Sequence, residues 1–544
     1  MKIVIIGAVA AGTSVAAKAR RNSEEAQIVV YEKDTDISYS VCGLPYYIAG
    51  SEIKREKLVP RNPEWFLKRH NIQIHTAHEV LKIDPSSKTL TVKNLSDQTV
   101  FEDSYDKLVL TTGASPIVPD IKNIHSPHVF FLRNVKDADA LKSFILTNKP
   151  KNALIIGSGF IALEMLESLS NIGINTTVIE RENRLMPRLD PDISILLENE
   201  LEKRGIRFVL SQSVNEIHQK LVSTDKGSVY EADFILVAAG VRPNTTLLKE
   251  IGIKTGKSGG ILVNEKMETS LKDIYAAGDC CEHLSLLTGE MIYRPMGSTA
   301  NKMGRILGDG LTGGDLRFQG ILGTGICRIF DKTIASTGMT EKEALSKGYD
   351  IEVIHNIKEN QSSYLPESSE MLIKAVADKK TETLLGVQIF GGKGVDKRID
   401  VFAAAISFKA KTKNLFHLDL AYSPQFATTK DPIHYTGMIL TNSFQRERKI
   451  ITPRELKENR KNWTVIDVRS LEDYEKGHIP DALHIPFQEL KEKSKDFRKS
   501  KPIVVHCNKG TTGNAAQNLL INLGFQKVYN LSGGYQNWKN QENL

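Results

Sequence analysis

A strand, a glycine turn and a helix follow one another at the start of this chain, and this pattern constrains its fold more than any other feature. The apolar strand KIVIIG leads into Gly7 and Gly12, a helix-like segment, and a second strand that ends at Glu32. Glycine lets the backbone turn tightly and approach an anion, and the helix amino terminus points at that anion. The segment therefore predicts a Rossmann-like α/β domain that binds a dinucleotide, although Val9 occupies the place of the middle glycine in GxGxxG.

A second copy of the pattern is complete. The segment ALIIGSGFIALE places Gly157, Gly159 and Ala162 after a strand, and Glu180 ends the next strand. Glu180 favours NADH, because a carboxylate repels the 2′-phosphate of NADPH, but nearby arginines soften this preference and leave NADPH possible. A chain with two such sites is usually built to pass electrons between two nucleotides, most simply NAD(P)H and FAD.

Three further strings support a flavoprotein. Segments 105–116 and 233–244 each run from a strand into a glycine, as expected where a chain crosses between two nucleotide domains. Segment 273–280 ends a strand with Gly278 and Asp279, and the Asp279 carboxylate can bond the ribityl or pyrophosphate region of FAD. The ordered set of motifs resembles the two-dinucleotide-binding flavoprotein disulfide reductases.

This resemblance implies an architecture as well as cofactors. An FAD-binding domain would comprise residues 1–118 and 245–325, an NAD(P)H-binding domain 119–244, and an α+β dimerisation domain 326–441. The candidate FAD-binding residues are Gly7, Ala10, Ala11, Gly12, Glu32, Lys33, Thr112, Gly113, Gly278 and Asp279, and those for NAD(P)H are Gly157, Gly159, Ala162 and Glu180.

Cys42 is the candidate redox thiol. It precedes a helix, where the helix dipole and an adjacent flavin would depress its pKa, and Gly43 and Pro45 indicate a turn rather than a packed helix face. The usual disulfide reductase carries CxxxxC at this place, but position 47 is Tyr. A lone Cys42 must cycle through a mixed disulfide with a small thiol, a persulfide or a sulfenic acid.

The segment SYSVCGLPY resembles the SFxxCGxPY signature of coenzyme A disulfide reductases, which NADH oxidases and peroxidases partly share. The peroxidases carry a His where the first glycine loop has Ala10, so peroxide chemistry is the weaker interpretation. Coenzyme A carries a 3′-phosphate and a pyrophosphate, so its site needs a basic entrance. The resemblance implies the substrate-binding residues Arg20, Arg21, Ser38, Tyr39, Lys68, Asn301 and Arg305.

Two tyrosines complete this resemblance. The segment YSPQFATTKDP resembles the carboxyl-terminal signature of coenzyme A disulfide reductases, in which a Tyr of the partner subunit reaches the mixed disulfide. It implies a homodimer in which Tyr422, and Tyr364 of SSYLP, lie near the reacting sulfurs. A phenol can hydrogen-bond or protonate a leaving thiolate.

The last part of the chain carries a second candidate thiol. After a charged linker at 442–450, the strings VIDVR, GHIPDALHIPF, PIVVHCNKGTTG and LSGGYQNW occur in order within 451–544 and resemble a single-domain α/β rhodanese. Backbone N–H groups around Cys507 would lower its pKa and stabilise a persulfide. Rhodanese loops often end CxxGxR, but Thr512 replaces that Arg, which puts thiosulfate use in doubt; Gly513 argues against a phosphatase of the C-x₅-R type.

Composition excludes several other classes of protein. The net charge of +7 is mild and suits an anionic small molecule, and we expect no nucleic-acid partner. No apolar run approaches the roughly 18 residues of a membrane span. Five scattered cysteines make neither a disulfide scaffold nor a metal site. The first residues could pass as a signal peptide, but the strand, turn and helix that follow favour a cytoplasmic protein.

A reductase and a rhodanese on one chain resemble the coenzyme A disulfide reductase–rhodanese fusions, which include NADH-dependent persulfide reductases. This resemblance implies an NAD(P)H-dependent flavoenzyme that reduces coenzyme A disulfide, coenzyme A persulfide or polysulfide through Cys42. The rhodanese-like domain would take sulfane sulfur from donors on Cys507. Two alternatives remain, an NADH oxidase that uses a Cys42 sulfenic acid and an electron-transfer flavoprotein with a docking rhodanese module.

Overall fold

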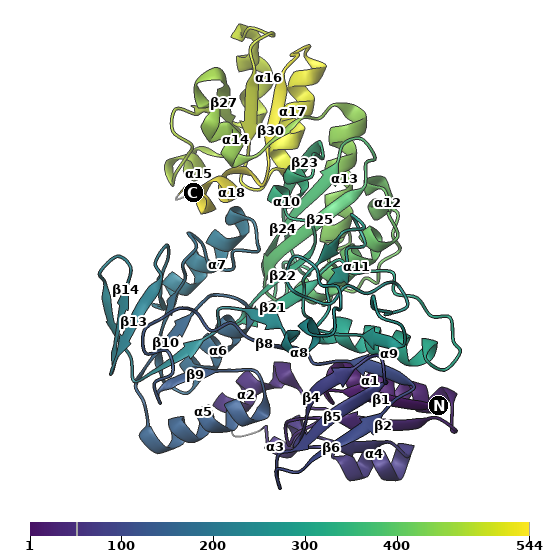
Figure 1. Cartoon of the computed structure of the whole chain (residues 1–544). Helices are drawn as coiled ribbons and strands as arrows, with labels where there is room; N and C mark the ends of the chain where they lie inside the picture. The colour runs from purple at the N-terminus through teal and green to yellow at the C-terminus, as the bar shows by residue number, and fades with distance from the viewer. Residues whose placement is uncertain (51–52, 543–544) are drawn as a thin grey trace. The chain divides into compact units, whose positions relative to one another are not determined.

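The computed structural model describes residues 1–50 and 53–542, which form two compact units. The first unit comprises Met1–Glu182 and Ile206–Ile321, and the second comprises Asn183–Gly205 and the chain from Leu322 onward. Figure 1 shows the elements of both units, coloured along the chain. Within the described residues, no helix is long and apolar enough to cross a membrane.

The first unit contains a parallel sheet built from both ends of its sequence. Its strands are β1 (Lys2–Ile6), β2 (Gln27–Tyr31), β3 (Gln73–His75), β7 (Lys107–Leu110) and β18 (Ile274–Ala276), in the order β18-β7-β1-β2-β3. The run Ile3–Ile6 is almost wholly buried, as expected for a parallel strand covered on both faces. Because β18 pairs with β7, residues after 245 complete a sheet that begins at residue 2.

Two helices pack closely beside this sheet. These are α1 (Ala10–Asn22) and α9 (Gly297–Gly310). A side chain at Gly304 would lie 2.5 Å from the carbonyl oxygen of Ala11, and one at Gly308 would lie 2.6 Å from that of Val15. The two glycines therefore allow close approach of the helices. The meander β4 (His78–Asp84), β5 (Thr89–Asn94) and β6 (Val100–Ser104) adds a small antiparallel sheet.

A second Rossmann-like sheet follows in the same unit. The strands β9 (Val129–Phe131), β10 (Asn152–Ile156), β11 (Asn175–Ile179), β12 (Arg207–Val209) and β16 (Phe234–Val237) are parallel, in the order β12-β11-β10-β16-β9. The helices α5 (Val135–Asn148) and α6 (Phe160–Asn171) accompany it. The two predicted chain crossings pair as antiparallel strands, β8 (Ala114–Pro116) with β17 (Val241–Pro243).

The second unit begins with an antiparallel sheet. Its strands β21 (Gly325–Ile329), β22 (Lys332–Gly338), β23 (Ile351–Glu359), β24 (Glu370–Asp378) and β25 (Leu384–Gly391) have the order β21-β22-β25-β24-β23. The helices α7 (Pro191–Lys203), α11 (Val395–Ser407) and α13 (Pro432–Arg446) pack with it. Two details differ from the sequence prediction: residues 183–205 pack with this unit, and α13 runs through half of the predicted linker at 442–450.

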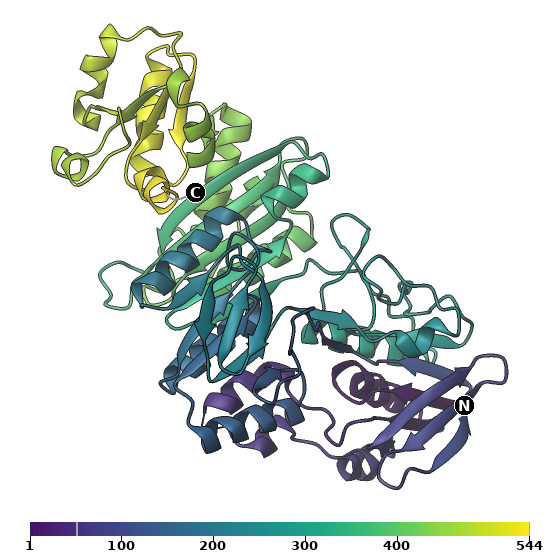
Figure 2. The same cartoon turned by 60° about the vertical axis from the view of Figure 1, so that its left-hand side comes forward.

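The last sheet is parallel and is covered on both faces (Figure 2). Its strands β26 (Ile450–Ile451), β27 (Thr464–Asp467), β28 (Leu483–His484), β29 (Ile503–His506) and β30 (Val528–Leu531) have the order β26-β30-β29-β27-β28. Ile503 and Val505 pack with α16 (Phe487–Lys493) and α17 (Thr511–Asn522), whereas Val504 packs with α14 (Pro453–Glu458) and α18 (Gly534–Asn540). This alternation follows from the two-residue period of a strand.

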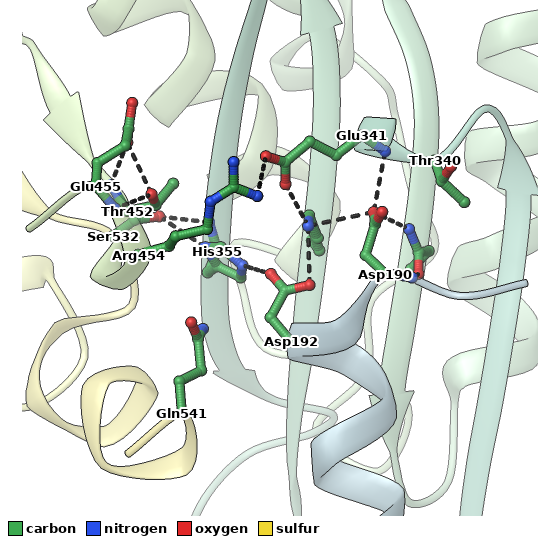
Figure 3. A network of polar contacts seen from close by, with 12 residues as sticks. Asp190, Asp192, Thr340, Glu341, His355, Thr452, Arg454, Glu455, Ser532 and Gln541 are labelled. Carbon is green, nitrogen blue, oxygen red and sulfur yellow. Dashed lines mark hydrogen bonds and ion pairs between the residues drawn. The ribbon is translucent and has the colours of Figure 1, made fainter. Parts of the chain in front are cut away.

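A buried charge cluster joins three parts of the second unit (Figure 3). Lys374 is 1% exposed, and its Nζ lies 2.9 Å from Asp192, 3.2 Å from Asp190 and 2.7 Å from Glu341. The other oxygen of Asp192 is 2.6 Å from Nε2 of His355, whose backbone N–H donates to Ser532 Oγ at 2.6 Å. The ammonium group of Lys374 thus connects α7 with the antiparallel sheet, and His355 extends the connection to Ser532 of the C-terminal α/β segment.

We predict that Lys374→Met destabilises the second unit by about 3–5 kcal/mol at pH 7, because it leaves buried carboxylates without their cation. Burial would raise the pKa of Asp192, but Lys374 and His355 outweigh it and lower that pKa. The stabilisation is therefore complete above the unfolded pKa of about 4 and is lost as the pH falls below it.

Urea unfolding of the wild type and of Lys374→Met, followed at several pH values, measures this difference. Exposed Lys380, which the same substitution can remove, provides the matched control. A difference between wild type and Lys374→Met that stays constant from pH 7 to pH 3 would contradict the assignment.

Candidate functional site

The first glycine turn has the geometry of a dinucleotide site. A side chain at Gly7 would overlap the carbonyl oxygen of Thr111, and one at Gly12 would overlap that of Gly7. Glu32 directly follows β2 beside this turn, where its carboxylate accepts a hydrogen bond from the N–H of Ala8 at 2.7 Å. The start of α1 has no side-chain cap, so its N–H groups remain available to a phosphate.

Asp279 gives an independent indication of a ligand. One of its carboxylate oxygens accepts a bond from Arg133 at 2.7 Å, while the other is buried and has no hydrogen-bond partner among the described residues. A buried acceptor without a partner is costly, and a ligand hydroxyl removes that cost. The site therefore fits the ribityl chain of FAD.

The remaining candidates for FAD surround this turn. Ala10 and Ala11 open α1, Lys33 is exposed after Glu32, and Gly278 has a φ of +86° directly before Asp279. Thr112 is committed to the chain crossing, because its hydroxyl donates to the carbonyl of Asn244 at 2.7 Å. Gly113 follows with a φ of +68°.

The second glycine turn fits a dinucleotide as well. Gly157 has a φ of +100°, and a side chain there would lie 2.6 Å from the carbonyl oxygen of Ala238. A side chain at Gly159 would meet no described atom within 4 Å, so the space before α6 is open. Ala162 is fully buried against its surroundings. Glu180 is 6% exposed and accepts a bond from Ser158 at 2.7 Å, in a position to receive ribose hydroxyls.

Cys42 lies in the short 3₁₀ turn Val41–Gly43, directly before α2 (Leu44–Ala49), and its side chain is exposed. Although Cys42 lies at the surface, neighbouring atoms partly shield its sulfur from water. This partial burial, followed by the charge of Glu164, raises the pKa of the thiol, and Arg133 lowers it only in part. The predicted depression of this pKa is therefore wrong for the protein groups alone. A helix of six residues adds little dipole to offset these effects.

Glu164 is a site residue that the sequence reasoning missed. It lies on α6, which packs against α2, and burial followed by the charge of Glu167 raises its pKa to about 7. A carboxyl that titrates near neutrality can hold or release a proton beside the thiol. The available signal was a carboxylate in the otherwise apolar start of the fingerprint helix, GSGFIALE.

The candidate residues for coenzyme A separate into two groups. Arg20 is 4% exposed, and its guanidinium donates to five backbone carbonyls, those of Ser23, Glu24, Ala26, His70 and Asn71. It has no donor left for a phosphate, and its assignment to coenzyme A does not fit the structure. The neighbouring Arg21 is exposed and electrostatically close to His70 on α4 (Pro63–His70).

The other candidates remain accessible. Asn301 and Arg305 are exposed on α9, and Asn301 accepts a bond from Ser14 of α1 at 2.7 Å. Lys68 is exposed on α4. Ser38 has a φ of +50° and its N–H donates to Ala8, while burial raises the pKa of Tyr39.

Both candidate tyrosines lie in the second unit. Tyr364 is 73% exposed and Tyr422 is 51% exposed, and Tyr422 lines a surface hollow with Lys397, Ser423 and Phe426. The N–H of Ser362 donates to the carbonyl of Pro424 at 3.1 Å, so the segments that carry the two tyrosines are bonded to each other.

Cys507 directly follows β29 and is 6% exposed in the loop that leads to α17. The N–H of Gly510 donates to its sulfur at 3.1 Å. The loop is braced from outside, because Asn530 donates to the carbonyl of Gly510 and the N–H of Tyr535 donates to that of Cys507. This loop can hold a sulfur anion on backbone dipoles.

Family models match the chain in three places. Residues 1–299 match the pyridine nucleotide-disulphide oxidoreductases, residues 326–432 match the dimerisation domain of these enzymes, and residues 452–541 match the rhodanese-like domain. The chain belongs to the pyridine nucleotide-disulphide oxidoreductase family and carries a C-terminal rhodanese-like domain. The family uses FAD and NAD(P)H, in agreement with the two glycine turns.

Three similar proteins narrow this assignment. The chain is 37% identical over 444 residues to the NAD(P)H sulfur oxidoreductase (CoA-dependent) of Pyrococcus furiosus, across 81% of this chain and 99% of that protein. It is 36% identical to reduced CoADR-RHD of Bacillus anthracis, with a TM-score of 0.97 and coverage of 99% and 98%. The NAD-dependent persulfide reductase of A. fulgidus is 35% identical, with a TM-score of 0.91 and coverage of 99% and 100%. These likenesses confirm the predicted fold class.

We predict that Glu164→Gln makes the Cys42 thiol more acidic by about half to one pKa unit, because it removes a nearby negative charge. Iodoacetamide labelling of the reduced protein across a pH series, resolved by peptide mass spectrometry, measures the change. The effect should appear above pH 7, where Glu164 is charged. The exposed Glu102→Gln should behave as wild type; a coincident Glu164→Gln profile would show that the carboxylate does not act on Cys42.

Proposed function

We propose that this protein is an NAD(P)H-dependent flavoenzyme that reduces coenzyme A disulfide and coenzyme A persulfide through a mixed disulfide on Cys42. The observation that carries the proposal is the exposed thiol of Cys42, which lies in the same compact unit as the two dinucleotide turns. Tyr47 stands where a disulfide reductase of the CxxxxC type has its second cysteine, so Cys42 has no partner thiol in that motif. The names of the similar proteins, which refer to coenzyme A, persulfide and NAD(P)H, support the same substrate class.

The cofactors have residues that fit them. FAD would lie against Gly7, Gly12, Glu32 and Asp279, with the FAD-binding domain at 1–118 and 245–325. NAD(P)H would lie against Gly157, Gly159, Ala162 and Glu180 within 119–244, and the dimerisation domain would span 326–441. Bound FAD supplies a two-electron path from NAD(P)H to a disulfide.

The proposed cycle at Cys42 needs only NAD(P)H, protons and the coenzyme A substrate. Two electrons and one proton convert Cys42–S–S–CoA into the Cys42 thiolate and free coenzyme A. The thiolate then attacks coenzyme A disulfide, re-forms the mixed disulfide and expels coenzyme A thiolate, which takes a proton. Attack on the inner sulfur of coenzyme A persulfide re-forms the same mixed disulfide and releases hydrogen sulfide instead.

Charged and phenolic groups serve this cycle. Arg21, Lys68, Asn301 and Arg305 are exposed and would bind the phosphates of coenzyme A, with Ser38 and Tyr39 beside the reacting segment. We propose a homodimer in which Tyr364 and Tyr422 of one subunit protonate the leaving thiolate at Cys42 of the other. The dimerisation-domain match supports this arrangement.

Cys507 would carry sulfane sulfur in the rhodanese-like domain, with 442–450 as the connection and 451–544 as the domain. Donors of sulfane sulfur would load Cys507, and the persulfide would pass to the coenzyme A pool. All five cysteines are free thiols, which is typical of a reducing compartment, and we propose that the enzyme acts in the cytoplasm.

Reciprocal serine variants test this assignment. Cys42→Ser should lose at least about a thousandfold in NADH-dependent reduction of coenzyme A disulfide, because the nucleophile is gone. Cys507→Ser should keep that activity and lose persulfide loading from external donors. Mass spectrometry of the purified protein should show a coenzyme A adduct on Cys42. Full turnover of Cys42→Ser, or stoichiometric oxygen consumption without added thiol, would favour an NADH oxidase and reject the proposal.

Nucleotide preference gives a second test. The preference for NADH is measured as kcat/KM with NADH divided by kcat/KM with NADPH. Glu180→Ser should reduce this ratio about tenfold, because it removes a carboxylate that repels the 2′-phosphate of NADPH. Steady-state kinetics with both nucleotides measure this ratio, and Glu102→Gln serves as the control for a lost surface charge. An unchanged ratio would mean that Glu180 does not face the ribose.

A further inference from the structure

The Cys507 loop lacks the arginine that often ends such loops, and Thr512 stands in its place. A sulfur anion on Cys507, or an anionic donor beside it, still gains from a nearby cation. Three cationic side chains contact this loop or the segments that brace it: Arg469, Lys509 and Lys358. Their partners decide which of them has charge to spare.

Arg469 is fully engaged within its own domain. It is 8% exposed, and it binds both carboxylate oxygens of Asp467 and the carbonyl of Gly477 at 2.7 Å. Its guanidinium also lies 4.1 Å from the ring centre of Tyr535. Asp467 therefore compensates its positive charge, and Arg469 fixes the loop rather than a ligand.

Lys509, inside the loop, turns away to the neighbouring sheet. Its Nζ lies 3.0 Å from Glu359 and also pairs with Glu370. Burial would lower the pKa of Lys509, but these two carboxylates raise it. Gln536, at the start of α18, donates to Glu370 at 2.6 Å. The glutamates of the antiparallel sheet thus hold the loop in place and balance the charge of Lys509.

Lys358 differs from the other two cations. It lies on β23, half-buried, and no carboxylate of the described residues lies within ion-pairing distance of its Nζ. That Nζ donates to the hydroxyl of Thr511 at 3.0 Å and lies 4.1 Å from the ring centre of Tyr435. Burial lowers the pKa of Lys358. The charge of Glu359 opposes this effect, Lys509 adds to it, and Cys507 makes a smaller opposing contribution.

The position of Thr511 makes this contact informative. Thr511 is the first residue of α17 and directly follows Gly510, whose N–H bonds the Cys507 sulfur. It is also the neighbour of Thr512, where the arginine is missing. The ammonium group of Lys358 therefore meets the same end of the helix at which the backbone donates to the sulfur.

We infer that Lys358 of the dimerisation domain supplies the cation that the rhodanese-like loop lacks, and so completes a site for anionic sulfane-sulfur donors at Cys507. This inference rests on the proposed role of Cys507 as a sulfur carrier. With thiosulfate, the Cys507 thiolate attacks the outer sulfur and the S–S bond breaks. Sulfite leaves with the electron pair, and the Cys507 persulfide anion remains beside Lys358.

The test uses the full-length protein in three variants. Lys358→Met removes the charge, Lys358→Arg keeps it, and Lys380→Met removes an exposed charge from the same domain. Two readouts are taken for each variant by peptide mass spectrometry: the pH profile of Cys507 alkylation by iodoacetamide, and persulfide formation on Cys507 from thiosulfate and from coenzyme A persulfide. Near-ultraviolet circular dichroism and the thermal midpoint report on folding.

We expect Lys358→Met to move the midpoint of the alkylation profile upward by about one pH unit and to slow persulfide formation about tenfold. Lys358→Arg should restore most of both, and Lys380→Met should match wild type. If wild type loads sulfur while Lys358→Met matches it in both readouts, the role of Lys358 is overturned. If wild-type Cys507 loads no sulfur from either donor, the proposed function of Cys507 fails, and the inference fails with it.

Discussion

The first unit depends on the close approach of the glycine turn at Gly7 and Gly12 to neighbouring backbone carbonyls. At Gly7 and Gly12, a single methyl group would overlap a carbonyl oxygen, and α1 could not then begin directly above β1. The same turn places Glu32 against the N–H of Ala8, and the pairing of β18 with β7 brings Asp279 to the same sheet from a distant part of the sequence. One steric constraint thus assembles an anion site from segments that are far apart along the chain.

Charge compensation plays the corresponding part in the second unit. Lys374 of β24 neutralises Asp192 of α7 and Glu341 of the short helix Glu341–Ser346, and Glu359 and Glu370 neutralise Lys509 of the rhodanese-like loop. Buried ion pairs add little net stability, but a wrong arrangement leaves an unpaired buried charge and is penalised. These pairs therefore select one position of the C-terminal segment on the sheet, and that position brings Lys358 to Thr511.

Features that depend on a short stretch of sequence could be predicted, whereas features that depend on contacts between distant segments could not. Glycine turns, strand ends and the Cys507 loop are local, and they appeared where the motifs indicated. Arg20 and Arg21 show the limit: neighbours on a helix point about 100° apart, so Arg20 is buried on backbone carbonyls and Arg21 faces solvent. The effect of Glu164 on Cys42 arises from the packing of α6 on α2, and no spacing within either segment announces it.

The raised pKa of Cys42 bears on how the proposed mixed disulfide would be cleaved. When a disulfide is cleaved, the sulfur with the lower pKa leaves more readily. In the proposed Cys42–S–S–CoA, burial and Glu164 would disfavour negative charge on the Cys42 side, so reduction at the Cys42 sulfur would expel coenzyme A as the thiolate. A thiolate of raised pKa is intrinsically more nucleophilic but less populated near pH 7, so Cys42 would have to give up its proton before it attacks the next disulfide. Glu164, whose pKa is raised to about 7, is the neighbouring group that would take this proton, so one carboxyl would both direct the cleavage and activate the thiol.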